Sequence, residues 1–279
     1  MQIIKTADEM KAFVKARKAE GKTIGLVPTM GYLHDGHASL IRKSASQNDV
    51  TVVSVFVNPT QFAPNEDYDK YPRDIDNDSR VASEAGADVI FNPEPSEMYP
   101  GLYKTYVQVD DITAKLCGIS RPTHFKGVTT VVCKLFNIAM ADRAYFGQKD
   151  AQQLAVIKRM AADLNMNTEI IGCPIVREAD GLAMSSRNIY LSAEERKQAL
   201  CLSRSVKAAK EAIDGGEVSS SNIKKIIKDI IAQSPLAVID HVEIVDFDTM
   251  DSIDTVKQGT LISLAVRFGS TMLIDNLII

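Results

Sequence analysis

The sequence has no apolar run near the roughly 20 residues that a membrane-spanning helix needs, which excludes an ordinary helical membrane protein. Its first segment, residues 1–22, also lacks the apolar stretch and the small-residue cleavage site of a signal peptide. We predict an amphipathic helix there instead. We therefore expect a cytoplasmic protein with no membrane partner.

Cysteine is scarce as well, and its spacing argues against two classes of site. The four cysteines are Cys117, Cys133, Cys173 and Cys201, and no two of them form a Cys-x-x-Cys pair. Their neighbours are mostly apolar. We therefore predict reduced, partly buried thiols and neither a metal site nor a disulfide framework.

An excess of basic charge is also missing. The 32 lysines and arginines against 36 aspartates and glutamates give a formal net charge of −4, which argues against general nucleic-acid binding. A small anionic substrate remains compatible, because it needs only a local cationic pocket. With 279 residues, 45% hydrophobic and 24% charged, the chain has the composition of a globular protein of one large or two smaller domains.

What the sequence does contain is an alternation of apolar, strand-like runs with helical periodicity. Strands are predicted at 23–27, 51–57, 88–91, 143–146 and 168–176, and helices at 38–47, 74–85, 125–140 and 151–164. Such alternation implies right-handed crossovers and a parallel sheet. We predict an α/β fold, with a doubly wound, Rossmann-like nucleotide-binding domain.

Beyond about Gly181 the pattern changes. Helices are predicted at 193–213 and 219–231, followed by strand candidates at 237–245, 260–267 and 271–278 with short polar connections, which favour antiparallel pairing. We therefore predict two domains. Residues 1–176 form the nucleotide-binding domain, and residues 177–279 form a smaller α+β lid domain, hinged at about 177–186.

The segment from Pro28 to His37 carries the strongest functional signal. A predicted strand runs into a glycine turn and then a helix, and His34 and His37 stand three residues apart beside Gly31 and Gly36. Backbone N–H groups at a helix start are unpaired and carry partial positive charge. Phosphate is therefore a natural ligand there.

Other polar groups follow predicted strands, where ligands of open α/β sheets bind. They lie at 58–61, 147–150 and 184–187. Plainer structural roles stay open for these residues and for 121–124, because turns and helix caps favour the same residue types. The acidic residues between Glu66 and Asp78 fit no metal-binding loop, and we predict that they form a solvated face.

Several motifs carry a resemblance to known proteins. His34-Asp35-Gly36-His37 resembles the His-x-Gly-His signature of the nucleotidyl-transferring superfamily that includes class I aminoacyl-tRNA synthetases. Met184-Ser185-Ser186-Arg187 resembles a variant of that superfamily's second phosphate-binding loop. Together with the motifs at 57–62, 71–74, 121–125, 146–150 and 186–188, these residues make the chain resemble the pantothenate synthetases.

The resemblance implies an activity. This family joins pantoate to β-alanine with ATP through a pantoyl adenylate, and it releases AMP and pyrophosphate. The resemblance further implies ATP with Mg²⁺, a place in pantothenate and coenzyme A biosynthesis, and a homodimer. It implies no prosthetic group and no nucleic-acid partner. A nucleotidyltransferase that keeps the nucleotide in its product is the alternative.

The resemblance also implies roles for individual residues. His37, His34, Lys149 and Arg187 are expected to be catalytic, with His37 as the hydrogen-bond donor in the transition state. The expected ATP contacts are Met30, Gly31, Tyr32, Leu33, His34, Asp35, Gly36, His37, Gly147, Gln148, Lys149, Asp150, Val176, Met184, Ser185, Ser186 and Arg187. The expected substrate contacts are Asn58, Gln61, Arg121, His124 and Gln153, and Asp150 is the candidate metal ligand. No base for the amine is evident, so positioning is expected to supply most of the second step's rate.

Overall fold

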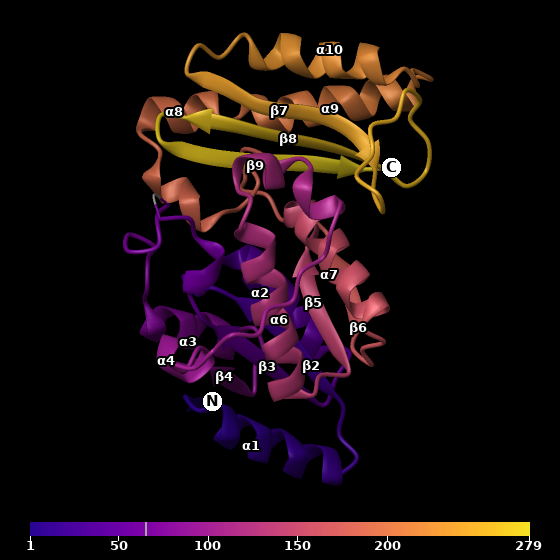
Figure 1. Cartoon of the computed structure of the whole chain (residues 1–279). Coiled ribbons are helices and arrows are strands. Elements are labelled where there is room, and N and C mark those ends of the chain that lie inside the picture. The colour runs from indigo at the N-terminus through magenta and orange to yellow at the C-terminus, as the bar shows by residue number, and fades with distance from the viewer. Residues whose placement is uncertain (65) are drawn as a thin grey trace.

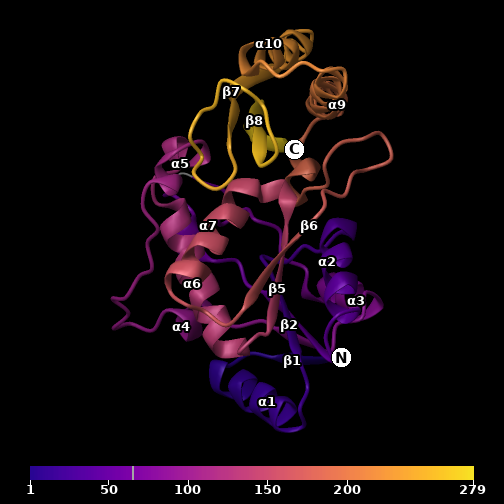
Figure 2. The ribbon, with the colours of Figure 1, turned by 90° about the vertical axis from the view of Figure 1, so that its right-hand side faces the viewer.

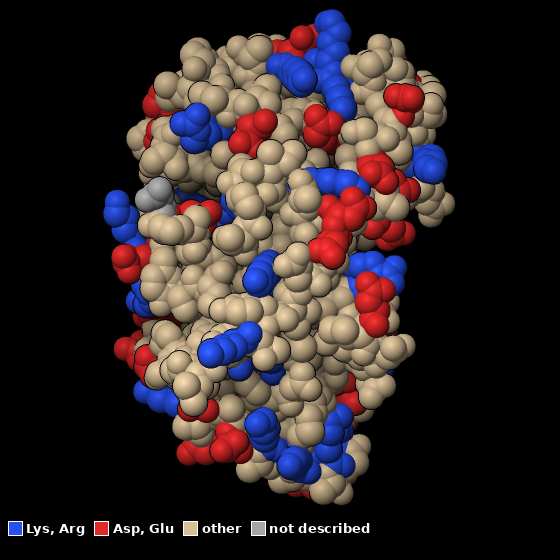
Figure 3. Space-filling model, in the orientation of Figure 1, with Lys and Arg blue, Asp and Glu red and all other residues tan. Residues whose placement is uncertain are grey.

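The computed structural model describes residues 1–64 and 66–279. Figure 1 shows an α/β unit that carries the amino terminus and, above it, a separate sheet covered by helices that carries the carboxyl terminus. In the part of the chain that the structure describes, no helix combines the length and the apolar character that crossing a membrane demands. Figure 3 shows acidic and basic side chains interspersed over one face of the molecule.

The α/β unit alternates strands with helices. Its elements are β1 (Gln2–Ile4), α1 (Ala7–Ala19), β2 (Ile24–Thr29), α2 (Asp35–Ala45), β3 (Val50–Val55), η1 (Pro59–Gln61), α3 (Ile75–Glu84), β4 (Val89–Phe91), α4 (Pro95–Met98), η2 (Ile112–Ala114), α5 (Cys117–Ser120), α6 (His124–Ala139), β5 (Arg143–Gly147), η3 (Gln148–Asp150), α7 (Ala151–Asp163) and β6 (Glu169–Cys173).

The six strands form one parallel sheet in the order β1-β4-β3-β2-β5-β6. The chain proceeds from β2 toward one edge and from β5 toward the other, so the strand order reverses between β2 and β5. In open α/β sheets, ligands bind in the crevice outside the carboxyl ends of the strands at such a point. The topology therefore places a binding crevice beside the ends of these two strands.

Both faces of the sheet are covered, as Figure 2 shows. Alternate strand residues point to opposite faces. Leu26 and Val52 pack in a core with α1, α6 and α7, whereas Val27 and Val53 pack in a second core with α2 and α3. This burial on both faces explains the near-continuous apolar runs in the sequence. The predicted doubly wound α/β fold is confirmed.

The second unit packs helices on an antiparallel sheet. Its elements are η4 (Ser186–Tyr190), α8 (Ala193–Gln198), α9 (Cys201–Asp214), α10 (Ser220–Ile231), β7 (Ala237–Asp246), β8 (Thr260–Phe268) and β9 (Thr271–Ile278). The strands pair in the order β7-β8-β9. The amphipathic helices α9 and α10 bury Leu202, Val206, Ile223 and Ile227 against inner-face residues of the sheet such as Ile262. The predicted smaller antiparallel unit is confirmed.

Two local predictions were wrong. Residues 1–22 do not form one helix, because Gln2–Ile4 pair as an edge strand with Val89–Phe91 and α1 begins only after the cap residue Thr6. The predicted helix 193–213 is interrupted between α8 and α9. Ala199 within the interruption and Cys201 directly after it are both fully buried, so the chain turns where both reach the core.

Candidate active site

A cavity lies at the carboxyl edge of the parallel sheet, where the topology places the crevice. Its empty volume is about 1250 Å³, with the open mouth included. The predicted site residues that line it are Met30, His34, Gly36, His37, Asn58, Gln61, Gly147, Lys149, Asp150, Gln153, Val176, Met184, Ser185, Ser186 and Arg187. The structure therefore brings the two motif loops, 30–37 and 184–187, to one cavity.

Other predicted site residues lie outside this lining. They are Gly31, Tyr32, Leu33, Asp35, Arg121, His124 and Gln148. Most of them belong to the turns whose backbone supports the lining residues. Among the described residues, none after Arg187 lines the cavity. Beyond Ser186 and Arg187 of η4, the second unit therefore acts on the cavity through contacts with the segments that form it.

The two histidines form the cap of helix α2. His34 is the cap residue, and its Nδ1 accepts a hydrogen bond from the Gly36 N–H at 3.1 Å. The His34 N–H donates to Nδ1 of His37 at 3.3 Å, and the two ring centroids lie 4.1 Å apart. In both rings Nδ1 acts as the acceptor, so the proton of each neutral ring sits on Nε2. Each ring thus retains one N–H donor for a ligand.

Both rings are held neutral. Burial, and secondarily the charge of Lys149, lowers the pKa of His34 to about 4. Burial lowers the pKa of His37 well below its usual value, and His34 and Lys149 add to this shift. Neutral rings that donate from Nε2 bind phosphate oxygens through hydrogen bonds and add no positive charge of their own.

These shifts predict that the protein loses stability in mild acid. Burial also lowers the pKa of His124 to about 4, so His34 and His124 stay neutral in the folded chain at pH values where the unfolded chain binds protons. Unfolding therefore takes up protons below about pH 6.5, and the free energy of unfolding falls as the pH falls from 6.5 toward 4. We expect a loss of about 1–2 kcal/mol per histidine at pH 5.

Urea unfolding at pH 7.5 and pH 5 measures this loss. In the variant His124→Gln we expect a smaller difference between the two pH values than in the wild type. An equal difference in the two proteins would show that His124 does not carry its share of the effect.

The loop before the histidines has a strained backbone. Gly31 and Tyr32 both have positive φ, +82° and 52°, and a Cβ at Gly31 would lie 2.8 Å from a carboxyl oxygen of Asp78. Asp78 is only 1% exposed, and it accepts hydrogen bonds from the N–H groups of Tyr32 at 3.1 Å and Leu33 at 2.6 Å. Burial raises the pKa of this carboxyl. Asp78 therefore holds the loop that presents the histidines.

The prediction of a solvated acidic face was wrong at three positions. Asp78 is buried, Glu66 pairs with Arg121 at 2.6 Å, and Asp67 pairs with Arg187 at 3.1 Å. The partners of Glu66 and Asp67 lie far along the chain, so local charge spacing gives no sign of them. For Asp78 the sequence offered one weak sign of a structural role, namely that an acidic residue stands at a buried position of helix α3.

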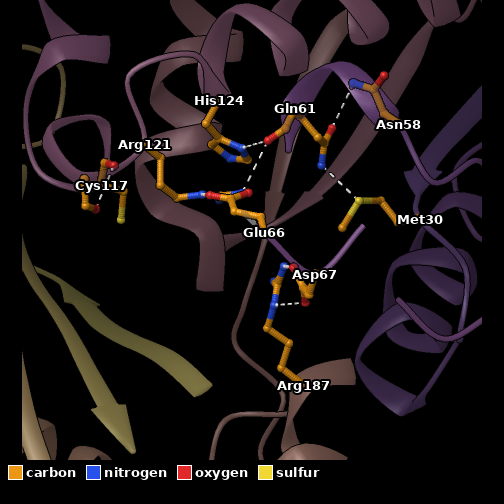
Figure 4. Close-up of polar contacts among 10 residues, drawn as sticks. Met30, Asn58, Gln61, Glu66, Asp67, Cys117, Arg121, His124 and Arg187 are labelled. Carbon is orange, nitrogen blue, oxygen red and sulfur yellow. Dashed lines mark hydrogen bonds and ion pairs between the residues drawn. The ribbon is translucent and has the colours of Figure 1, made fainter. Parts of the chain in front are cut away.

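The second motif loop contacts the first directly. Ser186 Oγ donates to the Tyr32 carbonyl at 3.4 Å, and the Ser185 side chain accepts from the Arg187 N–H at 3.3 Å. The Arg187 guanidinium donates two hydrogen bonds to Asp67, each 3.1 Å long, as Figure 4 shows. This fork also fits paired phosphate oxygens. Here the fork binds the carboxylate of Asp67.

Lys149, Asp150 and Gln153 approach the cavity from the start of α7. Lys149 forms no ion pair within the described residues 1–64 and 66–279. Its charge lies close enough to lower the pKa of both histidines. It is therefore a cation available to an anionic ligand beside the two Nε2 donors.

The amides of Asn58 and Gln61 form a hydrogen-bonded row with Met30 on another side of the cavity, shown in Figure 4. Asn58 Nδ2 donates to Gln61 Oε1 at 3.1 Å, and Gln61 Nε2 contacts Met30 Sδ at 2.9 Å. Tyr99, which the sequence did not point out, donates to Asn58 Oδ1 at 2.7 Å. Tyr99, which does not line the cavity, thus holds the row in place, and the row presents uncharged polar groups to a ligand.

Arg121 and His124 lie behind this row. The Arg121 guanidinium donates to the Gln61 carbonyl at 3.3 Å and to both carboxylate oxygens of Glu66 at 2.6 Å. His124 Nδ1 lies 2.9 Å from the same Gln61 carbonyl. Both side chains therefore hold the backbone of Gln61.

The remaining wall of the cavity is apolar. Val128, Val131, Val132 and Leu135 of α6 face it, together with Phe56 and Phe146. An elongated ligand that is anionic at one end and branched and apolar at the other matches this combination of walls.

The parallel sheet, the capped helix at its switch point and the cavity lined by Lys149 define an α/β nucleotide-binding enzyme. The chain belongs to the pantoate-beta-alanine ligase family, whose model matches residues 2–278. It is therefore a ligase.

Individual relatives agree. The chain is 60% identical to the pantothenate synthetase of Acetivibrio thermocellus over 279 residues, which cover 100% of this chain and 99% of the relative. It is 43% identical to the pantothenate synthetase of Thermus thermophilus, a crystal structure with a TM-score of 0.95 that covers 99% of both chains. A pantoate-beta-alanine ligase from Francisella tularensis, solved with beta-gamma ATP and beta-alanine, has a TM-score of 0.80 at 35% identity and covers 100% of this chain and 97% of that one.

Proposed function

We propose that this chain condenses pantoate with β-alanine in two steps, using ATP. A pantoate carboxylate oxygen attacks the α-phosphorus, the bond from that phosphorus to the bridging oxygen breaks, and pyrophosphate leaves. The β-alanine amine then attacks the acyl carbon of the pantoyl adenylate, and AMP leaves with the bond electrons. The observation that carries this proposal is the shared cavity of the loops 30–37 and 184–187 in a chain of this family.

In the first step, charge moves onto the pyrophosphate. We assign the Nε2 donors of His34 and His37 to the phosphates, because both rings are neutral and capped through Nδ1. Lys149 and Arg187 neutralise the triphosphate and the leaving group from opposite sides, with Ser185 and Ser186 between them. Donors placed in advance around developing charge supply the largest catalytic effect of such sites.

The acid substrate fits the other walls. The geminal methyl groups of pantoate suit the apolar side chains of α6, and its hydroxyls suit the amides of Gln61 and Gln153. Uncharged amides orient the carboxylate without trapping it in an ion pair, so it remains a nucleophile.

We assign the β-alanine end to Asn58, Arg121 and His124. Arg121 already binds a carboxylate in this structure, that of Glu66, and β-alanine presents the same group. We propose that the amine arrives deprotonated and that its position beside the acyl carbon supplies the rate.

One carboxylate of the cavity lining fits a magnesium ion. Mg²⁺ is usually held by one or two carboxylates together with substrate phosphates. Asp150 lines the cavity, and no cluster of three or more metal-ligating side chains occurs elsewhere in the described chain. Magnesium bound there with ATP would offset phosphate charge.

Finally, we propose that the enzyme works in the cytoplasm as a homodimer and that residues 177–279 form a domain that closes over the nucleotide about 177–186. Small-angle scattering with and without ATP measures the mass of the particle and any closure.

Pyrophosphate exchange tests the reaction. We expect labelled pyrophosphate to enter ATP only when pantoate is present, without β-alanine, and AMP to accumulate only after β-alanine is added. A panel of other hydroxy acids and amino acids serves as the control. Exchange that ignores pantoate would contradict the proposal, and exchange that depends on an amino acid would indicate a synthetase-like enzyme.

A further inference from the structure

Two successive residues of β9, Asp275 and Asn276, contact the segments that form the candidate site. Both are buried, with 1% and 4% exposure. Figure 1 shows β9 as the strand of the second unit that lies nearest to the α/β unit. Successive side chains of a strand point to opposite faces. The two residues can therefore reach two different segments from one strand.

Asn276 holds the turn that carries Lys149. Its Nδ2 donates to the carbonyl oxygens of Gln148 at 2.9 Å and Lys149 at 2.8 Å. A terminal amide has two N–H groups, and both are used here. Its buried Oδ1 has no hydrogen-bond partner in the described part of the chain. The two donated bonds therefore determine the orientation of the amide, and they fix the backbone from which the Lys149 side chain projects.

Asp275 holds the segment that carries the second motif loop. It accepts two hydrogen bonds from the Arg177 guanidinium, at 2.7 Å and 2.9 Å. Arg177 also pairs with Ala183 in a short hairpin, in which the Met184 N–H donates to the Val176 carbonyl at 3.0 Å. Bidentate arginine–carboxylate pairs fix orientation as well as distance. Asp275 thereby fixes the hairpin that leads into Ser185.

The tip of this hairpin belongs to the second unit by packing. Leu182 is 2% exposed and lies in the core formed with Leu202, Ile262 and Leu273. The second unit contributes no residue after Arg187 to the cavity lining. Its polar contacts with the segments that form the cavity include those of Asp275 and Asn276, and apolar packing of Leu182 and of Leu261 with Ala151 accompanies them.

We propose that Asp275 and Asn276 are positioning residues that align the two anion-binding segments, 148–150 and 184–187, on one triphosphate. The proposal rests on the proposed function, because it places ATP in the cavity. According to this proposal, one strand, β9, fixes the positions of both segments relative to each other. Neither residue contacts the reacting atoms. Substitution of Asn276 is expected to displace Lys149, and substitution of Asp275 is expected to displace the Ser185–Arg187 loop.

Two nearly isosteric substitutions test this role. Asn276→Asp replaces Nδ2 and its two N–H donors by one carboxylate oxygen that faces two carbonyls, and Asp275→Asn removes the charge that binds Arg177. We expect kcat/KM for ATP in pantoate-dependent exchange to fall about 10- to 100-fold in each variant, because small misplacements of catalytic groups cost this much. The KM for pantoate should change less than the KM for ATP, since Gln61 and the apolar wall of α6 are untouched.

The matched control is Asn222→Asp, because Asn222 is an exposed residue of α10 that bonds only to Glu217 among the described residues. It should exchange at the wild-type rate. Thermal unfolding with and without an ATP analogue supplies a second readout, in which the analogue should raise the Tm of Asn276→Asp less than that of the wild type. Asn276→Ala replaces Asn276→Asp if the latter shows no cooperative melt.

Two results would overturn the positioning role. They are a wild-type kcat/KM for ATP in the folded variants, and an equal rise of KM for ATP and pantoate, which would indicate general loss of structure. If the wild type shows no exchange at all, the proposed function fails instead. The analogue-induced Tm shift then still tests whether these residues support nucleotide binding.

Discussion

The variant His37→Ala is expected to lose pantoate-dependent pyrophosphate exchange by about 100- to 1000-fold, the usual cost of removing one donor to developing charge. His37 lines the cavity, its Nδ1 is used by the His34 N–H, and its Nε2 remains free for phosphate. The alanine variant also removes this cap contact. We therefore expect a stability loss of about 1 kcal/mol, as for other helix-cap substitutions.

Two further variants separate the cap from the donor. The amide oxygen of His37→Asn can replace Nδ1 as the acceptor for His34, but it leaves no donor at the position of Nε2. The longer His37→Gln places an amide N–H near that position. We expect His37→Asn to melt like the wild type and to be inactive, and His37→Gln to recover part of the rate. Full exchange by His37→Asn would contradict the assignment of Nε2 as the donor.

The second large effect is expected for Lys149→Met, which keeps most of the length of the side chain and removes its charge. Lys149 faces the cavity beside both histidines and forms no ion pair in the described parts of the chain. A preorganised cation on a leaving pyrophosphate makes a contribution of the same order as an oxyanion donor, so we expect exchange to fall about 100-fold or more. Steady-state exchange at saturating pantoate measures this.

The pKa of His34 distinguishes this electrostatic role of Lys149 from a structural one. The charge of Lys149 helps to keep the pKa of His34 near 4, so in Lys149→Met that pKa should rise toward its usual value. We expect a histidine NMR titration to show the rise. Lys43→Met, at an exposed position of α2 away from the cavity lining, is the control and should change neither the rate nor the titration. Wild-type exchange by Lys149→Met would remove the lysine from the mechanism.

The sequence predicted most of the fold because its signals were local. The run at 51–57 reads as a buried parallel strand from its composition alone, and β3 occupies Val50–Val55. The strand β1 has three residues and one neighbour, β4, whose residues lie more than 80 positions away. Nothing within residues 1–22 encodes that pairing. The amphipathic helix α1, which follows β1, dominates the hydrophobic periodicity of residues 1–22, so the whole segment was predicted as a helix.

In the candidate site, too, local features could be predicted and contacts between distant residues could not. The loop 30–37 was found from glycine and histidine spacing, because a strand–turn–helix junction needs those residues locally, and the loop 184–187 was found from its resemblance to a known phosphate-binding loop. The supporting groups were not found, because their partners are distant. Asp78 reaches the backbone of Leu33, and Asn276 reaches the carbonyl of Lys149. A buried aspartate and a surface aspartate look alike in one sequence.

The strand order of the large sheet also has a kinetic consequence. Central strand β2 is complete early in synthesis, but its second neighbour β5 begins only at Arg143, and only their pairing creates the switch point. Such non-local pairings form slowly, because closing a long chain segment costs conformational entropy before any new contact offsets that cost. The meander β7-β8-β9 pairs sequence neighbours and avoids that delay. On a ribosome, the nucleotide crevice therefore matures late relative to the helices beside it.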